Sequence, residues 1–452
     1  MRKNRIILST TQLIMISFLA VILVGSLLLV LPISSADEKS VSYADALFTA
    51  TTATCVTGLV TLPTVSTWSV FGQVVILCLI QLGGLGIITV MSGFMIALHK
   101  KIGISDRLLL QDAFNLNTLS GLVKFVKKVI AGTFVIEGIG ALLYMSVFVP
   151  DFGVKGIWIS LFNSVSAFCN AGIDIISENS LCDYATNPII NLVTSFLIVT
   201  GGIGYVVWWD FIRVVKLYKT HGMKCFKKMT LHSKIAICMT VLLIFIGGAL
   251  YFISEYNNPL TIGNHNLFDK IQLSLFQSVT TRTAGFATIP QENFTNTSAI
   301  VSLLLMFIGG SPVGTAGGVK TVTIAVLVIT AFSIVKDRNE ITVFNRAISQ
   351  KAVKKAVAVV GTSFVIMFVS TVLLSFVTDA RVIDILYETV SATATVGLTR
   401  NLTSSLDIWG KYIIIVTMYL GRIGPITLAI ALNTKKEKQN IVKTPYEDIS
   451  VG

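Results

Sequence analysis

The sequence predicts an all-α integral membrane protein built from four tandem repeats of span, re-entrant loop and span. Eight full spans and four re-entrant half-helices are expected around one pseudo-fourfold axis. Three observations lead to this fold class: an apolar composition, basic segments that alternate with acidic ones, and a glycine that recurs at nearly constant spacing. The 452 residues are 53% hydrophobic and 13% charged, with a mean hydropathy of +0.79. A soluble core of this length needs fewer apolar residues, so most of the chain is expected to lie in lipid.

The charged residues set the expected topology. Of the 35 Lys and Arg residues, 26 fall in five segments, at residues 2–5, 100–128, 213–234, 336–355 and 435–443. The segments between them carry acids instead, among them Asp37, Asp151, Asp174 and Glu255. By the positive-inside rule both termini and the three basic loops lie in the cytoplasm, which requires an even number of crossings. Because the net charge of +12 is divided among separate loops, nucleic acid is not an expected partner.

Apolar runs of spanning length come in four pairs. A bilayer core needs about 20 helical residues, and eight runs qualify: 6–33 with 70–98, 129–149 with 188–208, 235–254 with 298–335, and 356–378 with 408–432. No small-residue cleavage site follows the first run, so we interpret it as a retained span rather than a signal peptide. The pairs divide the chain into repeat 1 (1–99), repeat 2 (100–212), repeat 3 (213–335, with a broken second span), repeat 4 (336–434) and a cytoplasmic tail (435–452).

Each pair encloses a shorter stretch that is rich in Ser and Thr. These stretches, at 43–60, 157–174, 267–287 and 382–399, are too short to cross the bilayer and are expected to form re-entrant loops. One glycine aligns in each of them: Gly58, Gly172, Gly285 and Gly397, which lie 114, 113 and 112 residues apart. A glycine cluster follows 24 to 29 residues later in every copy. Two aligned markers in four consecutive copies indicate an internal repeat.

Four such units in one orientation can enclose a cation pore. A cation that sheds its water needs replacement oxygens, which the backbone carbonyls of extended loops supply. Glycine suits such loops because it tolerates positive φ and has no Cβ, and the preceding half-helix directs the negative end of its dipole at the ion. The expected ion-binding residues are Thr54, Cys55, Val56, Thr57, Gly58, Cys169, Asn170, Ala171, Gly172, Arg282, Thr283, Ala284, Gly285, Ala394, Thr395, Val396 and Gly397. The sulfur atoms of the two cysteines are expected to pack, and the Arg282 side chain to point away from the axis.

The second span of repeat 3 contains ten residues that a continuous helix does not tolerate. Glycine and proline at this density unwind a helix. An unwound loop near the axis would lie beneath the filter and obstruct the path; a simple kink or a transporter-style binding break is the alternative. The expected gate residues are Gly309, Gly310, Ser311, Gly314, Thr315, Ala316, Gly317 and Gly318, together with Arg422 at matching depth in repeat 4.

Two charged residues inside apolar runs leave alternatives open. A buried arginine needs water, an acid or carbonyl groups around it. Arg422 therefore either sets an electrostatic barrier to cations or pairs with an acid such as Glu388. Glu137 is expected to make a helix-to-helix hydrogen bond rather than to take part in transport.

With these features the chain resembles the Trk/Ktr/HKT superfamily of potassium transporters over essentially its whole length. The filter glycine of each copy, the break at 309–318 and Arg422 match that superfamily's filter, intramembrane gating loop and neighbouring arginine. The early start of the first repeat resembles the membrane subunits of bacterial Ktr systems, the KtrB type, more than the TrkH type, which carries an extra helix pair ahead of it.

The resemblance implies partners as well as an ion. Four filter glycines imply potassium as the transported substrate, with no cofactor in this chain. A homodimer with one pore per subunit is implied, as is a cytosolic, nucleotide-binding KtrA-type ring on the inner face of the bacterial cytoplasmic membrane. The basic loops either dock that ring or serve topology and contact anionic membrane lipid.

Other function classes fit less well. The four histidines, His99, His221, His232 and His265, follow no catalytic spacing, so no enzyme is expected. A carrier with inverted repeats would need an odd number of crossings in each unit, whereas each unit has two. The six cysteines form no CxxC pair, so neither a zinc site nor a disulfide framework is indicated. The remaining alternative is a sodium-permeable or sodium-coupled cation transporter, because these residues do not distinguish passive from coupled transport.

Overall fold

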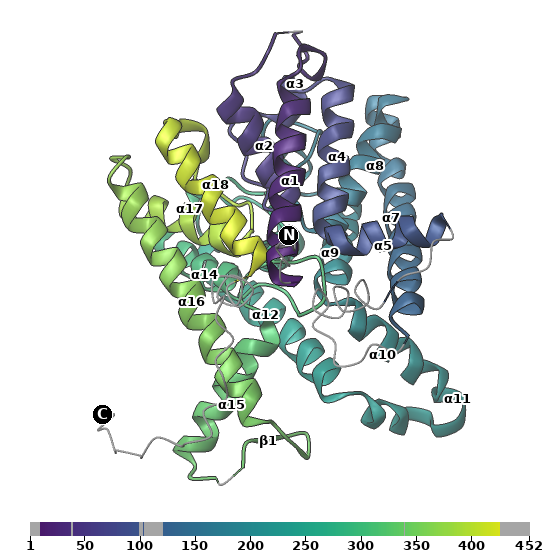
Figure 1. Cartoon of the computed structure of the whole chain (residues 1–452). Helices are drawn as coiled ribbons and strands as arrows, with labels where there is room; N and C mark the ends of the chain where they lie inside the picture. Colours follow the sequence, from purple (N-terminus) through teal and green to yellow (C-terminus); the bar gives the residue numbers. More distant parts are fainter. Residues whose placement is uncertain (1–9, 38, 99–102, 104–120, 339, 425–452) are drawn as a thin grey trace, which may run out of the picture.

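The computed structural model describes residues 10–37, 39–98, 103, 121–338 and 340–424. Within them, helical units follow one another along the chain, each with a long helix, a shorter helix and a second helical segment (Figure 1). The expected cytoplasmic segments at residues 2–5 and 435–452, and with them both termini, lie outside the described residues.

The helices and the short strands are these. The first unit contains α1 (Thr10–Val30), η1 (Pro32–Ser34), α2 (Tyr43–Cys55), α3 (Thr64–Thr67), α4 (Val70–Leu85) and α5 (Ile87–Ala97). The second contains α7 (Leu122–Phe152), α8 (Lys155–Cys169), η2 (Cys182–Tyr184), α9 (Pro188–Gly202), α10 (Tyr205–Lys216), α11 (Tyr218–His221) and η3 (Gly222–Lys228). The third contains α12 (Leu231–Glu255), α13 (Leu267–Thr280), η4 (Gln291–Asn293), α14 (Asn296–Phe307) and α15 (Thr321–Val335). The hairpin β1 (Thr342–Val343) and β2 (Arg346–Ala347) leads to the fourth, with α16 (Gln350–Ser375), α17 (Val382–Ala394), η5 (Thr403–Ser405) and α18 (Ile408–Ile423).

A polar cap fixes the start of the second helical segment in all four units. The side chains of Ser69, Asn187, Thr295 and Asp407 accept hydrogen bonds from backbone N–H groups in the first turns of α4, α9, α14 and α18. Such caps satisfy donors that the helix itself leaves unpaired. The sequence therefore sets the point at which each of these helices begins.

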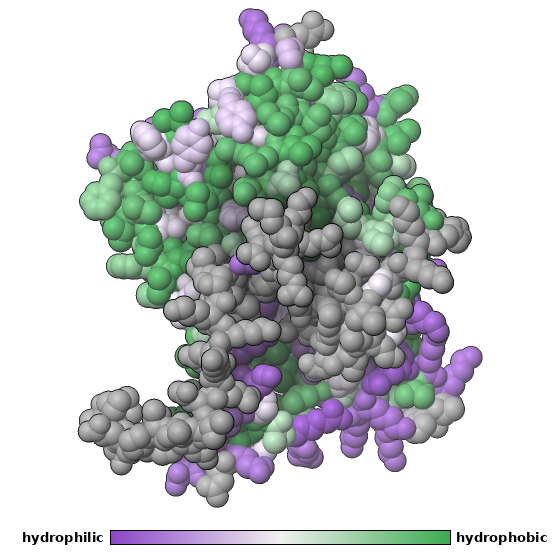
Figure 2. Space-filling model, viewed as in Figure 1, coloured by the Kyte–Doolittle hydropathy of each residue, from purple (hydrophilic) through white to green (hydrophobic). Residues whose placement is uncertain are grey.

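The units pack around a common centre in chain order. Helix α4 contacts α8, α9 contacts α13, α14 contacts α17, and α18 returns to contact α2. Apolar side chains on the outer helices stay exposed, including Leu27 on α1, Phe134 on α7, Phe245 on α12 and Phe368 on α16. Figure 2 shows a broad apolar surface on one face of the molecule. An apolar exterior of this kind suits contact with lipid, and the chain is a multi-pass membrane protein.

The spans are less regular than the sequence predicts. Among the described residues, α1, α7, α12 and α16 are each long and apolar enough to cross a membrane. The pairs α4–α5 and α9–α10 bend by 98° and 97°, and counting each pair as one span gives up to six. The expected eight full spans remain a prediction.

The predicted spans over 70–98 and 188–208 are bent, so among the described residues the break expected in the second span of repeat 3 has counterparts in repeats 1 and 2. The cause lies at Gly86 and Gly204, whose positive φ values of 83° and 96° do not continue a helix. Glycine adopts this conformation without a steric penalty.

Candidate functional site

The four short helices end in the same way beside the aligned glycines. Helices α2, α8, α13 and α17 end at Cys55, Cys169, Thr280 and Ala394. In every copy the residue two positions before the aligned glycine is left-handed, with φ of 55° at Val56, 60° at Asn170, 66° at Thr283 and 51° at Thr395. The glycines follow with φ of 95° at Gly58, 64° at Gly172, 84° at Gly285 and 100° at Gly397. Non-glycine residues rarely adopt this region, so the loops share one unusual backbone path.

These glycines form a closed ring. A Cβ added at Gly58 would lie 2.5 Å from the carbonyl oxygen of Ala171, and one at Gly172 would lie 2.5 Å from that of Ala284. A Cβ at Gly285 would lie 2.6 Å from the oxygen of Val396, and one at Gly397 would overlap the oxygen of Thr57. Each glycine thus faces the carbonyl that precedes the next glycine in chain order. Four equivalent carbonyls meet at one place, and a side chain would not fit there.

Hydroxyl groups of the short helices hold the loops in place. The N–H of Gly58 donates to Thr52 Oγ1 at 2.9 Å, and the N–H of Gly397 donates to Ser391 Oγ at 3.0 Å. In the second copy the N–H of Ile173 donates to Ser166 Oγ at 3.2 Å. In the third, Thr280 Oγ1 donates to the carbonyl of Phe286 at 2.6 Å. The Ser and Thr content of these helices therefore has a structural reason, because the buried loop amides and carbonyls need partners.

The later glycine clusters let the second helices approach these loops. A Cβ added at Gly83, Gly201 or Gly421 would overlap the carbonyl oxygen of Thr54, Phe168 or Thr393 respectively. Each of those carbonyls lies four residues before the ring glycine of its own copy. Gly309 differs, because a Cβ there would overlap Gly317 instead. In the third copy the glycine therefore packs against the unwound residues 308–320 and not against the short helix α13.

That segment, residues 308–320, lies against the loops of three copies. Thr315 Oγ1 donates to Asn170 Oδ1 at 2.8 Å, and the N–H of Gly317 donates to Thr283 Oγ1 at 3.2 Å. A Cβ on Gly317 would overlap the hydroxyl of Thr395. These contacts are those of an unwound loop packed beside the glycine ring, and a simple kink would not make them.

Further hydrogen bonds attach the same segment to the second copy. The N–H groups of Ser311 and Thr315 donate to the carbonyls of Gly202 and Gly201 at 2.8 and 3.1 Å, and the carbonyl of Val313 accepts from the N–H of Tyr205 at 2.8 Å. The bend at Gly204 makes room for this arrangement, because a Cβ there would meet the Pro312 carbonyl. The segment also contains the remaining predicted gate residues, Gly309, Gly310, Gly314, Ala316 and Gly318. Gly318 has a φ of 65°.

Arg422 bridges the loop to the first copy. Its guanidinium donates to the carbonyl of Thr315 at 2.7 Å and also to the carbonyl of Gly83. The alternative pairing with Glu388 is wrong, since that carboxylate accepts from the hydroxyl of Thr399 at 2.6 Å, and no salt bridge to Arg422 occurs in the part of the chain that the structure describes. Backbone carbonyls satisfy this buried cation instead of an acid.

A cavity of 380 Å³ lies beside the loop. Arg422 and Lys320 are the charged residues among those that line it, and both are positive. The Lys320 ammonium donates to the carbonyls of Ala316 at 2.6 Å and Gly317 at 3.4 Å. Sequence reasoning missed Lys320, although a single lysine that directly follows a Gly-rich break in an apolar run is a detectable signal. Two positive charges at low dielectric oppose the passage of a cation.

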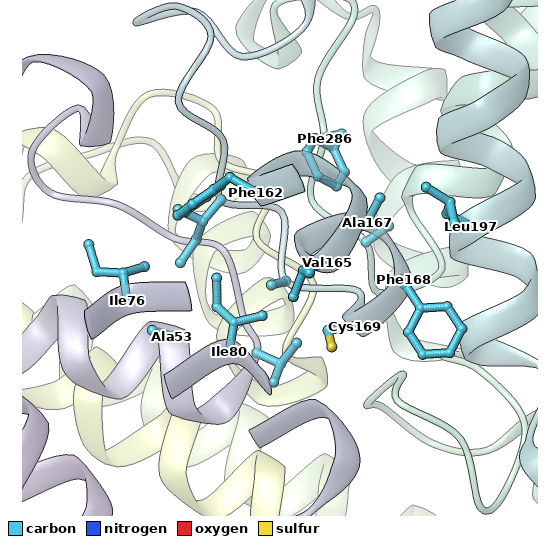
Figure 3. Close-up of a cluster of buried hydrophobic side chains, with 14 of the residues drawn as sticks. Ala53, Ile76, Ile80, Phe162, Val165, Ala167, Phe168, Cys169, Leu197 and Phe286 are labelled. Carbon is cyan, nitrogen blue, oxygen red and sulfur yellow. The ribbon is translucent and has the colours of Figure 1, made fainter. Parts of the chain in front are cut away.

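Other predicted side chains face away from the ring. Arg282 reaches the carbonyl of Thr240 on α12 at 3.5 Å. Cys169 belongs to the buried cluster in Figure 3, together with Phe168 and Ile80, and Cys55 lies in a second apolar cluster. These three residues contribute backbone rather than side chain to the loops.

The acids near the site have protein partners. Glu137 on α7 accepts a hydrogen bond from Gln81 of α4 at 3.3 Å, a contact between helices. Asp174 lies in the loop just beyond Gly172, outside the helices, and its carboxylate accepts from the N–H of Ile176 at 3.4 Å. Burial raises the pKa of Asp174 to about 6.

Comparison with known proteins adds a family to this geometry. The sequence matches the TrkH family, described as cation transport protein, over residues 5–444. It is 39% identical to the potassium/sodium uptake protein NtpJ of Enterococcus hirae, covering 98% of each chain. It is also 39% identical to the Ktr system potassium uptake protein B of Bacillus subtilis, covering 98% of this chain and 96% of that one. Among solved structures, the potassium transporter TrkH from Vibrio parahaemolyticus superposes with a TM-score of 0.76 at 17% identity, over 96% of this chain and 87% of the other.

Proposed function

The chain belongs to the TrkH family of cation transport proteins, and we propose that it carries potassium into a bacterial cell through the ring of Gly58, Gly172, Gly285 and Gly397. Its relatives are ion transporters and not enzymes. The names of two relatives at 39% identity include potassium uptake, and this supports the choice of ion.

One observation carries the proposal: each ring glycine faces the carbonyl that precedes the next one, at Thr57, Ala171, Ala284 and Val396. Four carbonyls around one axis can replace the water shell of a monovalent cation. The negative ends of the short helix dipoles add to the attraction. The residues 54–58, 169–172, 282–285 and 394–397 include no acid, so the selectivity filter would be built from backbone carbonyls.

The loop at 308–320 is the proposed gate. This loop contacts Asn170, Thr283 and Thr395, which lie in the loops of the second, third and fourth copies. Arg422 connects it to the first copy. With Lys320 beside it, the closed path would combine a steric block with a positive potential. Opening then requires the hydrogen bonds to Asn170 and Thr283 to break.

The assembly is also part of the proposal. Four repeats at 1–99, 100–212, 213–335 and 336–434 would place eight crossings around the pore, with both termini and the tail 435–452 in the cytoplasm. A homodimer with one pore per subunit would carry a cytosolic nucleotide-binding ring on its inner face. Two of the relatives are named as subunits of Ktr systems, which supports a partner of this kind.

Sodium is the second candidate ion. One relative is named for potassium and sodium together, but the comparisons do not favour sodium permeation or sodium coupling over potassium uptake. The four ring glycines favour potassium, according to the resemblance described above.

Complementation tests the proposed function. Expression in a bacterium that lacks potassium uptake, with a regulatory subunit supplied, is expected to restore growth at low potassium. Uptake of ⁸⁶Rb⁺ with sodium removed tests whether transport is coupled to sodium. Failure of a membrane-inserted chain to restore growth would contradict the potassium assignment, and loss of ⁸⁶Rb⁺ uptake without sodium would indicate coupling.

A further inference from the structure

We propose that α10 lies flat on the inner membrane surface and, together with the start of α7, binds the headgroups of anionic phospholipids. The first observation is its direction. Helix α10 bends by 97° from α9, and α9 is the apolar segment that would cross the bilayer. A helix at a right angle to a crossing segment runs close to the membrane plane.

The exposed side of α10 has two sectors. The apolar side chains of Phe211, Ile212 and Val215 are 44%, 40% and 45% exposed, and at 100° per residue they lie together. Arg213 and Lys216, both exposed, occupy the neighbouring sector. This division is typical of a helix that places its apolar side in acyl chains and its basic side among headgroups.

Hydrogen bonds and a small apolar cluster hold α10 against the segment that follows it. Asp210 accepts hydrogen bonds from the N–H and the hydroxyl of Thr230, both at 2.9 Å, and pairs with Arg213 at 2.6 Å. Val214, Cys225 and Met229 form a small buried cluster beneath it. The segment from α10 through η3 is therefore folded, and these contacts hold its exposed residues in place.

The positive charge of this surface is not balanced by acids of its own described segments. Exposed lysines are found at 216, 219, 224 and 227 in this segment and at 124, 127 and 128 on α7. Asp210 is the single acid in residues 121–136 and 205–254, and it already pairs with Arg213. Figure 2 shows hydrophilic side chains gathered on the side where Figure 1 draws α10 and α11.

Helix α7 adds to this surface although it is distant in sequence. The Lys128 ammonium lies 5.1 Å from the centre of the Trp209 ring, and Gly132 packs beside Trp208 and Trp209. Tryptophan prefers the interface between headgroups and acyl chains. A lysine of α7 thus lies against the aromatic pair of α10, and together with the exposed apolar sector this arrangement favours lipid phosphate over a protein partner, which would leave that sector uncovered.

Lipid retention tests the proposal without measuring transport, so its outcome is separate from that of the proposed function. The whole chain is purified in mixed micelles with equal amounts of phosphatidylglycerol and phosphatidylcholine, and bound lipids are counted by native mass spectrometry. Each lysine near an anionic surface contributes about fivefold to binding. The double variant Lys216→Gln, Lys219→Gln is therefore expected to lower phosphatidylglycerol retention by at least tenfold and leave phosphatidylcholine unchanged.

A matched control removes the same charge elsewhere. The variant Lys351→Gln, Lys354→Gln alters two exposed lysines at the start of α16 and is expected to lower phosphatidylglycerol retention less than the first variant does, because in the described part of the chain no exposed apolar sector beside an aromatic pair accompanies these lysines. Equal loss in both variants, or no loss in the first, would overturn the proposal. Unchanged lipid retention with a lost response to a regulatory subunit would also overturn it, because the surface would then dock a protein.

A depth measurement provides a second, independent check. A nitroxide at position 212, in a chain whose exposed Cys78 and Cys238 are replaced by serine, is expected to collide with oxygen more than with a water-soluble nickel complex. A nitroxide at position 219 is expected to show the reverse. Preferential collision with nickel at both positions would place α10 in water and contradict the proposal.

Discussion

Replacing Arg422 with alanine should raise potassium flux by releasing the loop at 308–320. The guanidinium donates to the carbonyls of Thr315 and Gly83. The bond to Thr315 joins Arg422 to the loop, and a hydrogen bond to a charged group contributes about 1.5–3 kcal/mol. At about 1.4 kcal/mol for each factor of ten, the lower value raises the ratio of open to closed loops by roughly tenfold. Removal of one positive charge lowers the barrier to cations as well.

The assay is ⁸⁶Rb⁺ uptake into proteoliposomes at matched protein content, without a regulatory subunit. Deletion of several residues within 309–318 is measured in parallel and should raise flux in the same direction, with selectivity nearly intact. Arg422→Lys serves as the control, since it keeps the charge but loses the planar group that reaches two carbonyls, and an intermediate flux is expected. A fall in flux for both Arg422→Ala and the deletion would refute the gate. A rise in the deletion alone would leave Arg422 as a structural residue.

Three further changes test other parts of the site. Gly58→Ser should reduce potassium preference over sodium, because a Cβ would lie 2.5 Å from the Ala171 carbonyl at a φ of 95°; an unchanged permeability ratio would remove Gly58 from the filter. Lys320→Met should raise flux with little change in selectivity, since it removes the ammonium that binds the Ala316 carbonyl at 2.6 Å; reduced flux at equal membrane abundance would argue against that role. Burial raises the pKa of Asp174 to about 6, so lowering the external pH through that value should protonate the carboxylate and weaken potassium uptake at low concentration. Asp174→Asn should abolish this pH dependence, and a dependence that survives would assign it to another group.

Much of the architecture follows from the sequence because it repeats. The spacing of Gly58, Gly172, Gly285 and Gly397 predicts the four loops, and the structure brings those residues into one ring. The glycine clusters that follow each loop predict a second repeated contact, and Gly83, Gly201 and Gly421 in these clusters each pack against the short helix of their own copy.

The errors concern backbone path and pairing. Hydropathy does not reveal a right-angle bend, because the residues after Gly86 and Gly204 stay apolar enough to continue a span. The partner of Arg422 depends on a loop that folds back between copies, so the sequence alone leaves pairing with an acid open as an alternative. Lys320 was overlooked for a similar reason, since its contacts are to carbonyls only three and four residues away.

The most direct test of the central claim is the position of a bound ion. In crystals grown with thallium or rubidium, anomalous scattering should show a peak on the axis between the carbonyls of Thr57, Ala171, Ala284 and Val396, whose oxygens face the ring glycines. Exchange into sodium should remove or weaken that peak. Anomalous density confined to other parts of the protein, with none at the ring under conditions that support flux, would contradict a carbonyl filter at these glycines.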